Sequence, residues 1–112
     1  MSTILDDQLQ ELILQMEHFG LANDQRENDR QQKMLNLERD SAVLIHIFLR
    51  ATRRRNILEI GTSNGYSTIW LADALRRLGQ GQVTSIDRER RYKKCGHIDI
   101  FGYIGGYWFF CV

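Results

Sequence analysis

The sequence lacks the features that define several common classes of protein. It holds no run of about 18 consecutive apolar residues, so it is not expected to cross a membrane. Its formal net charge of +1 implies no general electrostatic attraction to nucleic acid. Its two cysteines, Cys95 and Cys111, fit neither a metal-binding motif nor a disulfide framework. The first residues lack the basic and apolar regions of a secretory signal, and the expected location is therefore the cytoplasm.

The length of 112 residues is enough for one small domain, which begins with a helical pattern. Residues 4–19 are predicted to form an amphipathic helix, with Thr3 and Asp6 as a capping box and Gly20 at its end. The polar residues 22–33 carry charges of both signs, which is typical of a solvated linker or an exposed helix face. The apolar residues of the first helix recur at intervals of three and four: Leu5, Leu9, Leu12, Ile13, Met16 and Phe19.

A second, more apolar helix is predicted over residues 41–51, with Ser41 as its cap. His46 lies within this run, and we interpret it as a core or boundary residue rather than a ligand. The three arginines at 53–55 could form a phosphate-binding patch. No aromatic residues are interleaved with them, so we favour charges that complement the end of a helix.

The next segment has the pattern of one β-α-β unit. Residues 57–60 and 83–86 are apolar strands, and residues 66–78 form a helix whose end is marked by Gly79 and Gly81. The predicted fold class is therefore α/β. The apolar stripe of the connecting helix is Ile69, Ala72, Leu75 and Leu78.

The turn between the first strand and this helix has the character of a cofactor site. Gly61 and Gly65 let the backbone approach a ligand closely, and the start of the helix offers unpaired N–H groups. Asp87 follows Gly65 by about 20 residues, where an α/β cofactor site places the carboxylate that binds ribose hydroxyls. Ser63 stands where nicotinamide enzymes have the second glycine of G-x-G-x-x-G, which disfavours an oxidoreductase.

Residues 59–65, Glu-Ile-Gly-Thr-Ser-Asn-Gly, resemble the E/D-x-G-x-x-x-G motif of class I S-adenosylmethionine-dependent methyltransferases. The continuation Gly-Tyr-Ser-Thr at 65–68 and the segment 81–87 are similar to the O-methyltransferase branch that includes the catechol type. The resemblance is specific over residues 56–88, weaker over 34–55, and ends near Arg91. It implies the N-terminal half of a Rossmann-like methyltransferase fold, apparently incomplete.

The resemblance also implies roles for individual residues. Glu59 would face the methionine amine, Ser67 would bind the methionine carboxylate, and Asp87 would bridge both ribose hydroxyls. Alternatively, Glu59 is only a strand-end carboxylate, Ser67 only a helix cap, and Asp87 part of a surface ion pair. The expected S-adenosylmethionine site comprises Glu59, Gly61, Thr62, Ser63, Gly65, Ser67 and Asp87.

The last residues differ in character from the rest. Residues 92–112 hold seven of the eleven aromatic residues, both cysteines and four of the nine glycines. The family places its adenine contacts, metal carboxylates and general base after the second strand, and nothing in this tail matches them. No catalytic or metal residue is therefore assigned, and metal dependence stays open. Either the reading frame or the chain's end has been altered near Arg91, or this is a genuine short β-rich ending.

These patterns predict three regions: an N-terminal helical extension and polar linker (1–35), a partial S-adenosylmethionine-binding α/β domain (36–91), and an aromatic tail (92–112). The expected function is an O-methyltransferase, or a truncated portion of one, that methylates a hydroxyl of a small acceptor. Whether the chain itself catalyses this reaction is open, and weak or undetectable binding of S-adenosylmethionine is expected of the chain alone. The alternative is a non-catalytic fragment or interaction module that associates with a partner or another copy through its N-terminal helices and apolar tail. Neither nucleic acid nor a membrane is expected as a partner.

Overall fold

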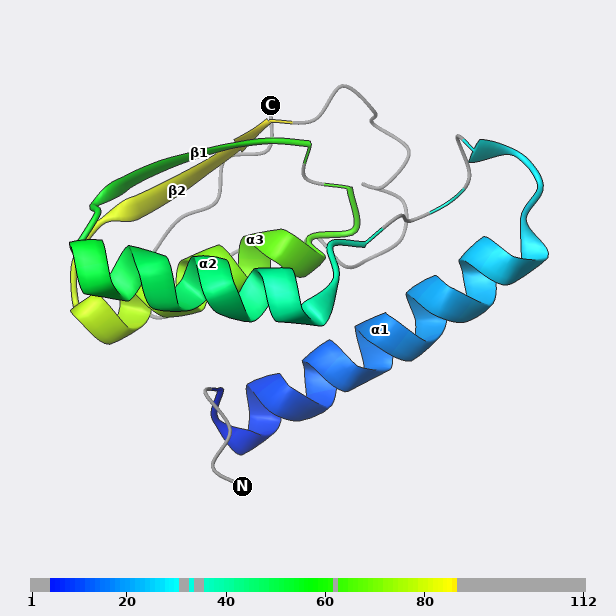
Figure 1. Ribbon diagram of the computed structural model, residues 1–112, viewed down its shortest axis with the longest axis horizontal. Helices are drawn as coiled ribbons and strands as arrows, with labels where there is room; N and C mark the ends of the chain where they lie inside the picture. The colour runs from blue at the N-terminus through cyan, green and yellow to red at the C-terminus, as the bar shows by residue number, and fades with distance from the viewer. Residues whose placement is uncertain (1–4, 31–32, 34–35, 62, 87–112) are drawn as a thin grey trace.

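The computed structural model describes residues 5–30, 33, 36–61 and 63–86. The elements in these ranges are α1 (Asp7–Arg26), α2 (Arg39–Thr52), β1 (Asn56–Ile60), α3 (Tyr66–Leu78) and β2 (Gln82–Ile86), in that order (Figure 1). None of the helices within these ranges is long and apolar enough to span a membrane. The expectations for Thr3, Thr62, Asp87 and residues 92–112 lie outside the described residues.

Helix α1 begins three residues later than predicted, at Asp7, and continues beyond the predicted end at Phe19. Asp6 is its N-cap, and the Asp6 side chain accepts a hydrogen bond from the backbone N–H of Leu9 at 3.0 Å. The prediction that Gly20 ends the helix is wrong, because α1 continues through a buried Gly20 as far as Arg26. A glycine inside a helix costs only about 1 kcal/mol relative to alanine, which the burial of neighbouring residues can offset. The first part of the polar segment 22–33 is therefore helical.

Helix α2 also begins earlier than predicted. Its N-cap is Glu38, which places Ser41 inside the helix, so the assignment of Ser41 as the cap is wrong. Arg53 ends the helix in the left-handed conformation with φ of 54°, and its backbone N–H donates to the carbonyl of Leu49. His46 is fully buried, as the sequence pattern indicated.

The two strands form a parallel pair joined by α3, which confirms the predicted β-α-β unit. Each strand begins one residue earlier than expected, and the register pairs Asn56 with Gln82 and Ile60 with Ile86. Figure 1 shows that both strands end on the same side of the molecule as the start of α3. Ligands of open α/β sheets bind at this carboxyl edge, so the topology brings the glycine turn to the expected place.

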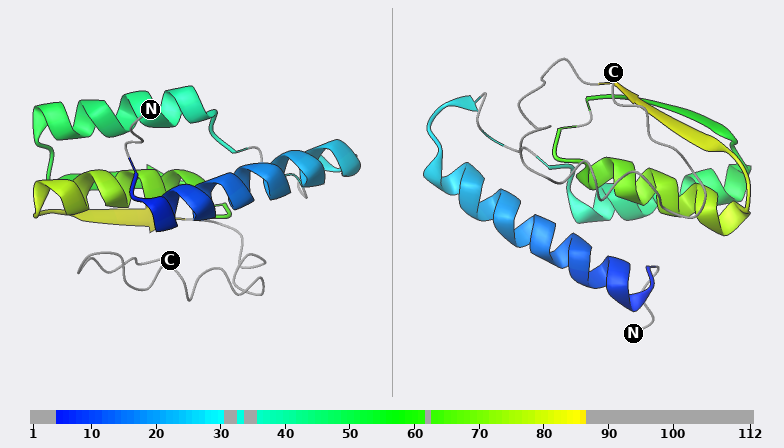
Figure 2. Two further views of the ribbon diagram at one scale, coloured as in Figure 1. Left: turned by 90° about the horizontal axis from the view of Figure 1, so that it is seen from below. Right: turned by 180° about the vertical axis from the view of Figure 1, so that it is seen from behind.

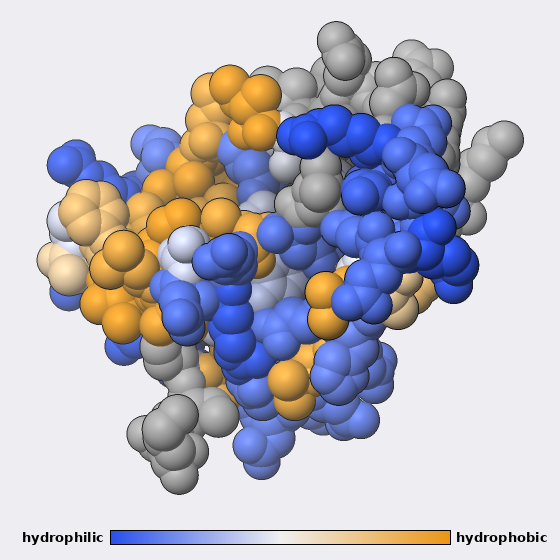
Figure 3. All heavy atoms as spheres, turned by 45° about the vertical axis from the view of Figure 1, so that its right-hand side comes forward, coloured by the Kyte–Doolittle hydropathy of each residue, from blue (hydrophilic) through white to orange (hydrophobic). Residues whose placement is uncertain are grey.

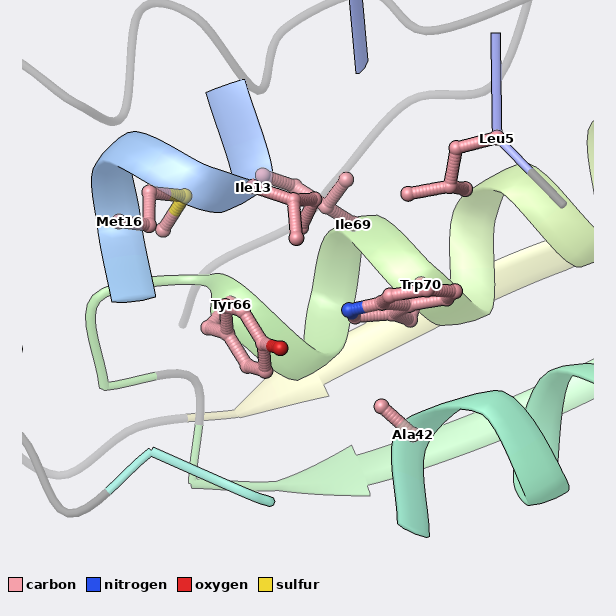
Figure 4. Packing of buried hydrophobic residues seen from close by; sticks show 7 residues of the cluster. All are labelled: Leu5, Ile13, Met16, Ala42, Tyr66, Ile69 and Trp70. Atoms are coloured by element: carbon pink, nitrogen blue, oxygen red, sulfur yellow. The ribbon is translucent and has the colours of Figure 1, made fainter. Parts of the chain in front are cut away.

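Helix α3 is the centre of the described fold, because it packs on both of its sides. On one side it meets α1 and α2, and on the other it meets the sheet (Figure 2). In Figure 4 the side chains from the three helices point toward one another. The larger core cluster consists of Leu5, Ile13, Met16, Ala42, Tyr66, Ile69 and Trp70. The cluster next to the sheet consists of Ala72, Leu75 and Val83.

Several large apolar side chains outside these clusters remain exposed. Leu58 and Ile60 of β1 are 61% and 84% exposed, so the sheet face opposite α3 is open at β1. In the view of Figure 3, apolar residues gather toward the upper left, while hydrophilic residues cover most of the remaining described surface. The exposed apolar residues of α2 are Leu44, Ile45, Ile47 and Phe48. Self-association through this face of α2, which the alternative of an interaction module implies, stays a prediction.

Candidate functional site

The carboxylate of Glu59 is the polar centre of the carboxyl edge of the sheet. It lies near the end of β1 and accepts hydrogen bonds from three hydroxyl groups. Ser67 donates to Oε2 at 2.5 Å, while Ser85 donates to Oε1 at 2.7 Å and Thr68 donates to the same Oε1. The hydroxyls come from the first turn of α3 and from β2, so the carboxylate joins both strands to the helix.

The parallel register explains why Ser85 reaches this carboxylate. Glu59 and Ser85 are register partners in the β1–β2 pair, so their side chains leave the sheet on the same face. That face is the one covered by α3. Ser67 and Thr68 are the second and third residues of α3, which begins at Tyr66, and their hydroxyls reach Glu59 near the end of β1. A sequence motif of one acidic and three hydroxyl residues becomes a single cluster only through this pairing.

The turn between β1 and α3 has an unusual backbone. Gly61 and Gly65 have φ of 98° and 86°, and Ser63 adopts φ of 50°. A left-handed conformation costs a non-glycine residue roughly 1–2 kcal/mol, and such strain is concentrated at functional sites. A Cβ atom added at Gly61 would meet no atom within 4 Å, so the space beside this backbone is open. Ligand atoms could approach the turn closely there.

The start of α3 is held by a side chain and by α1. The Asn64 side chain accepts a hydrogen bond from the backbone N–H of Tyr66 at 3.2 Å. The buried Tyr66 hydroxyl donates to Glu17 of α1 at 2.6 Å. Burial, reinforced by this hydrogen bond to Glu17, raises the pKa of Tyr66 far above its ordinary value. Arg39 of α2 pairs with Glu17 at 3.1 Å, so both other helices fix the position of the turn.

A second polar cluster lies farther along α3, around the fully buried Asp73. Its carboxylate is 2.8 Å from Nε2 of His46 on α2, and it accepts hydrogen bonds from Arg76 and Arg77. Burial raises the pKa of Asp73, but hydrogen bonds from His46, Arg77 and Arg76 outweigh it and hold that pKa well below its ordinary value. Arg76 also donates to Asp6 at 2.8 Å, which ties the start of α1 to α3. This cluster gives Nε2 of His46 a buried partner and joins the three helices.

The structure brings together most of the residues expected in the site, although Thr62 and Asp87 lie outside the described residues. Those brought to the edge of the sheet are Glu59, Gly61, Ser63, Gly65 and Ser67.

Sequence reasoning missed Thr68 and Ser85 as partners of Glu59. The signal available in the sequence was a hydroxyl residue beside Ser67, namely Thr68, and a serine two residues before Asp87, namely Ser85. The structure shows that Ser85 is the register partner of Glu59. Within the described ranges, no group of three or more His, Cys, Asp or Glu side chains could hold a metal ion.

Comparison with known proteins agrees with this geometry. A family model described as a methyltransferase domain matches residues 58–103, a range that contains the whole glycine turn and continues past Arg91. No curated protein sequence matches the chain. Among solved structures, one similar protein is the O-methyltransferase TomG from Streptomyces achromogenes, involved in tomaymycin synthesis and crystallised with S-adenosylmethionine. It is 26% identical, with a TM-score of 0.60, and the match covers 96% of this chain and 43% of that one.

Two further structures show the same fold. An O-methyltransferase from Bacillus cereus in complex with S-adenosylhomocysteine (SAH) is 24% identical, with a TM-score of 0.60, over 96% of this chain and 44% of that one. A Staphylococcus aureus protein, provisionally assigned as a caffeoyl-CoA O-methyltransferase, is 22% identical, with a TM-score of 0.66, over 95% of this chain and 47% of that one. The chain thus spans less than half the length of these three structures. It has the fold of the N-terminal portion of a class I S-adenosylmethionine-dependent O-methyltransferase, as its motifs predicted.

Proposed function

We propose that this chain binds S-adenosylmethionine at the carboxyl edge of its sheet and forms the N-terminal part of an O-methyltransferase. The methyl acceptor is a hydroxyl of a small molecule. The observation that carries the proposal is the Glu59 carboxylate, which lies beside a strained, open glycine turn and the start of a helix. In the whole enzyme the cofactor supplies an already activated methyl group, so the protein has mainly to orient it and exclude water.

The donors and acceptors at this edge suit the amino acid end of the cofactor. A carboxylate such as Glu59 matches an ammonium group, as in charge-assisted hydrogen bonds generally. The backbone N–H groups of Ser67 and Thr68 lie in the first turn of α3, where the helix itself supplies no acceptor, and they match a carboxylate. Gly61 leaves room for the ligand above the turn. Asp87, by its place after β2, would bind the ribose hydroxyls.

Binding can be tested by titrating the isotope-labelled 112-residue chain with SAH and following its backbone amides by NMR, which detects millimolar affinities. We expect the amide signals of Gly61, Gly65 and Ser67 to shift. Glu59→Gln should weaken binding roughly tenfold or more, because it removes a charged hydrogen-bond acceptor. Glu11→Gln, an exposed position on α1, is the matched control and should leave the affinity unchanged. If no amide of the turn shifts at millimolar SAH, the proposal is wrong.

A second candidate function is association with another copy of the chain or with a partner protein. The exposed apolar residues of α2, among them Leu44 at 68% and Phe48 at 58%, favour it. Such surfaces commonly mark interaction sites. The two functions are separable, because substitutions on the exposed face of α2 should change the molecular mass in solution without changing the SAH-dependent shifts of the turn.

A further inference from the structure

The two oxygens of the Glu59 carboxylate have different surroundings. Oε1 accepts hydrogen bonds from both Thr68 and Ser85, and each of these residues is only 1% exposed. Oε2 accepts from Ser67, which is partly exposed. The Oε1 side of the carboxylate is thus buried between α3 and β2, whereas the Oε2 side lies toward solvent.

The number of hydrogen bonds sharpens this difference. A carboxylate oxygen offers about two lone-pair directions. Two hydroxyl donors therefore fill the capacity of Oε1. Oε2 accepts one hydrogen bond from the part of the chain that the structure describes, so it retains capacity for a further donor. An ammonium group of a ligand is such a donor, and it would donate a hydrogen bond to the charged carboxylate of Glu59 at Oε2.

The donors to Oε1 also restrict the orientation of the carboxylate. A glutamate side chain that is free to rotate loses rotamer freedom when a ligand fixes it, and this loss weakens binding. Thr68 belongs to α3 and Ser85 to β2, so the two hydroxyls hold Oε1 from two different elements. Folding therefore already restricts the rotamers of Glu59, and the carboxylate is oriented before the ligand binds.

We propose that Thr68 and Ser85 are positioning residues, which fix Oε1 of Glu59 so that Oε2 receives the ammonium group of the bound ligand. This inference rests on the proposed function, because it concerns the same site. The role of orienting the carboxylate through Oε1 belongs to the two buried hydroxyls and not to Ser67, which donates to Oε2. Ser67 lies on the open side and its hydroxyl can turn from Glu59 toward the ligand, whereas the hydroxyls of Thr68 and Ser85 act only through Glu59.

The test compares two ligands that differ in the amino acid end. SAH carries the amine and carboxylate, and 5′-methylthioadenosine lacks both. We expect Thr68→Val and Ser85→Ala each to raise the dissociation constant for SAH by about three- to tenfold. The affinity for 5′-methylthioadenosine should stay unchanged. Thr68→Ser retains the hydroxyl and should restore the affinity for SAH to within about twofold.

The matched control is Thr84→Val, which makes the same chemical change on the opposite face of β2 and should alter neither affinity. Equal weakening of both ligands by Thr68→Val and Ser85→Ala would mean that the hydroxyls only support the fold, and would overturn the inference. Unchanged SAH affinity in folded variants would overturn it as well. Ser85→Ala is the smaller change and provides the test if Thr68→Val does not fold. If the wild-type chain binds neither ligand at the turn, the proposed function itself fails.

Discussion

Replacement of Asp73 by asparagine should destabilise this fold more than any surface change. The Asp73 side chain is fully buried and accepts hydrogen bonds from Arg76 and Arg77, with His46 at 2.8 Å. Asparagine keeps the shape but removes the charge, and its amide N–H₂ group would face the N–H groups of arginine. Breaking a buried charge pair costs about 3–5 kcal/mol. We expect the lower end of this range, because the two arginine side chains are about one third exposed and can bind water.

Urea unfolding followed by circular dichroism measures this loss directly. A domain of this size has a total stability of roughly 5–10 kcal/mol, so Asp73→Asn should remove a large part of it. Asp40→Asn makes the same chemical change at an exposed position in the first turn of α2 and should cost less than about 1 kcal/mol. A loss below about 1 kcal/mol for Asp73→Asn would refute the reasoning, because the buried cluster would then contribute no more than a surface charge.

The same cluster predicts a pH dependence. The folded state holds the pKa of Asp73 well below its ordinary value, so this carboxylate binds a proton less readily in the folded chain than in the unfolded one. Its stabilisation is therefore complete above the unfolded-state pKa of about 3.9 and is lost as the pH falls through the lower folded-state pKa. The stability of the wild type should therefore fall as the pH drops below about 4, and this fall should be smaller in Asp73→Asn, which has no carboxylate to protonate at this position. An equally steep fall in both proteins would contradict this assignment.

Three further predictions concern the turn, the surface and the cofactor. Gly81→Ala should lower the melting temperature, because a Cβ atom at Gly81 would clash with the carbonyl oxygen of Arg55 and its φ is 112°; an unchanged melting temperature would refute this. Phe48→Glu should reduce the molecular mass measured by light scattering, because it places a charge on the exposed apolar face of α2. Arg50→Glu changes an exposed position on the same helix that is already charged, and it should leave the mass unchanged. Asp87→Ala should weaken SAH binding by about 1.5–3 kcal/mol in the NMR titration, and an unchanged affinity would remove Asp87 from the site.

Some of the candidate site could be predicted because it depends on neighbours in sequence. The order of an apolar strand, Glu59, a turn with Gly61 and Gly65, and a helix beginning at Tyr66 follows from local propensity and from the freedom of glycine. The helix boundaries at α3 agree with its apolar stripe, since one face of that stripe had to be buried. Local signals were weaker at α1, where Gly20 resembled a stop and proved to be an interior residue.

Local sequence patterns were enough to predict the β-α-β order, the glycine turn and the acidic residue near the end of β1, because each depends on residues within a few positions of one another. The hydroxyls that reach Glu59 became known only from the packed fold, since Ser85 reaches it through the parallel register and Thr68 through the packing of α3. The packed fold also decided that His46 would meet Asp73, 27 residues later in the chain, because only the packing of α2 on α3 brings them together. Side chains that are distant in sequence interact only after the helices and strands pack, and a local sequence pattern does not show which of them will meet.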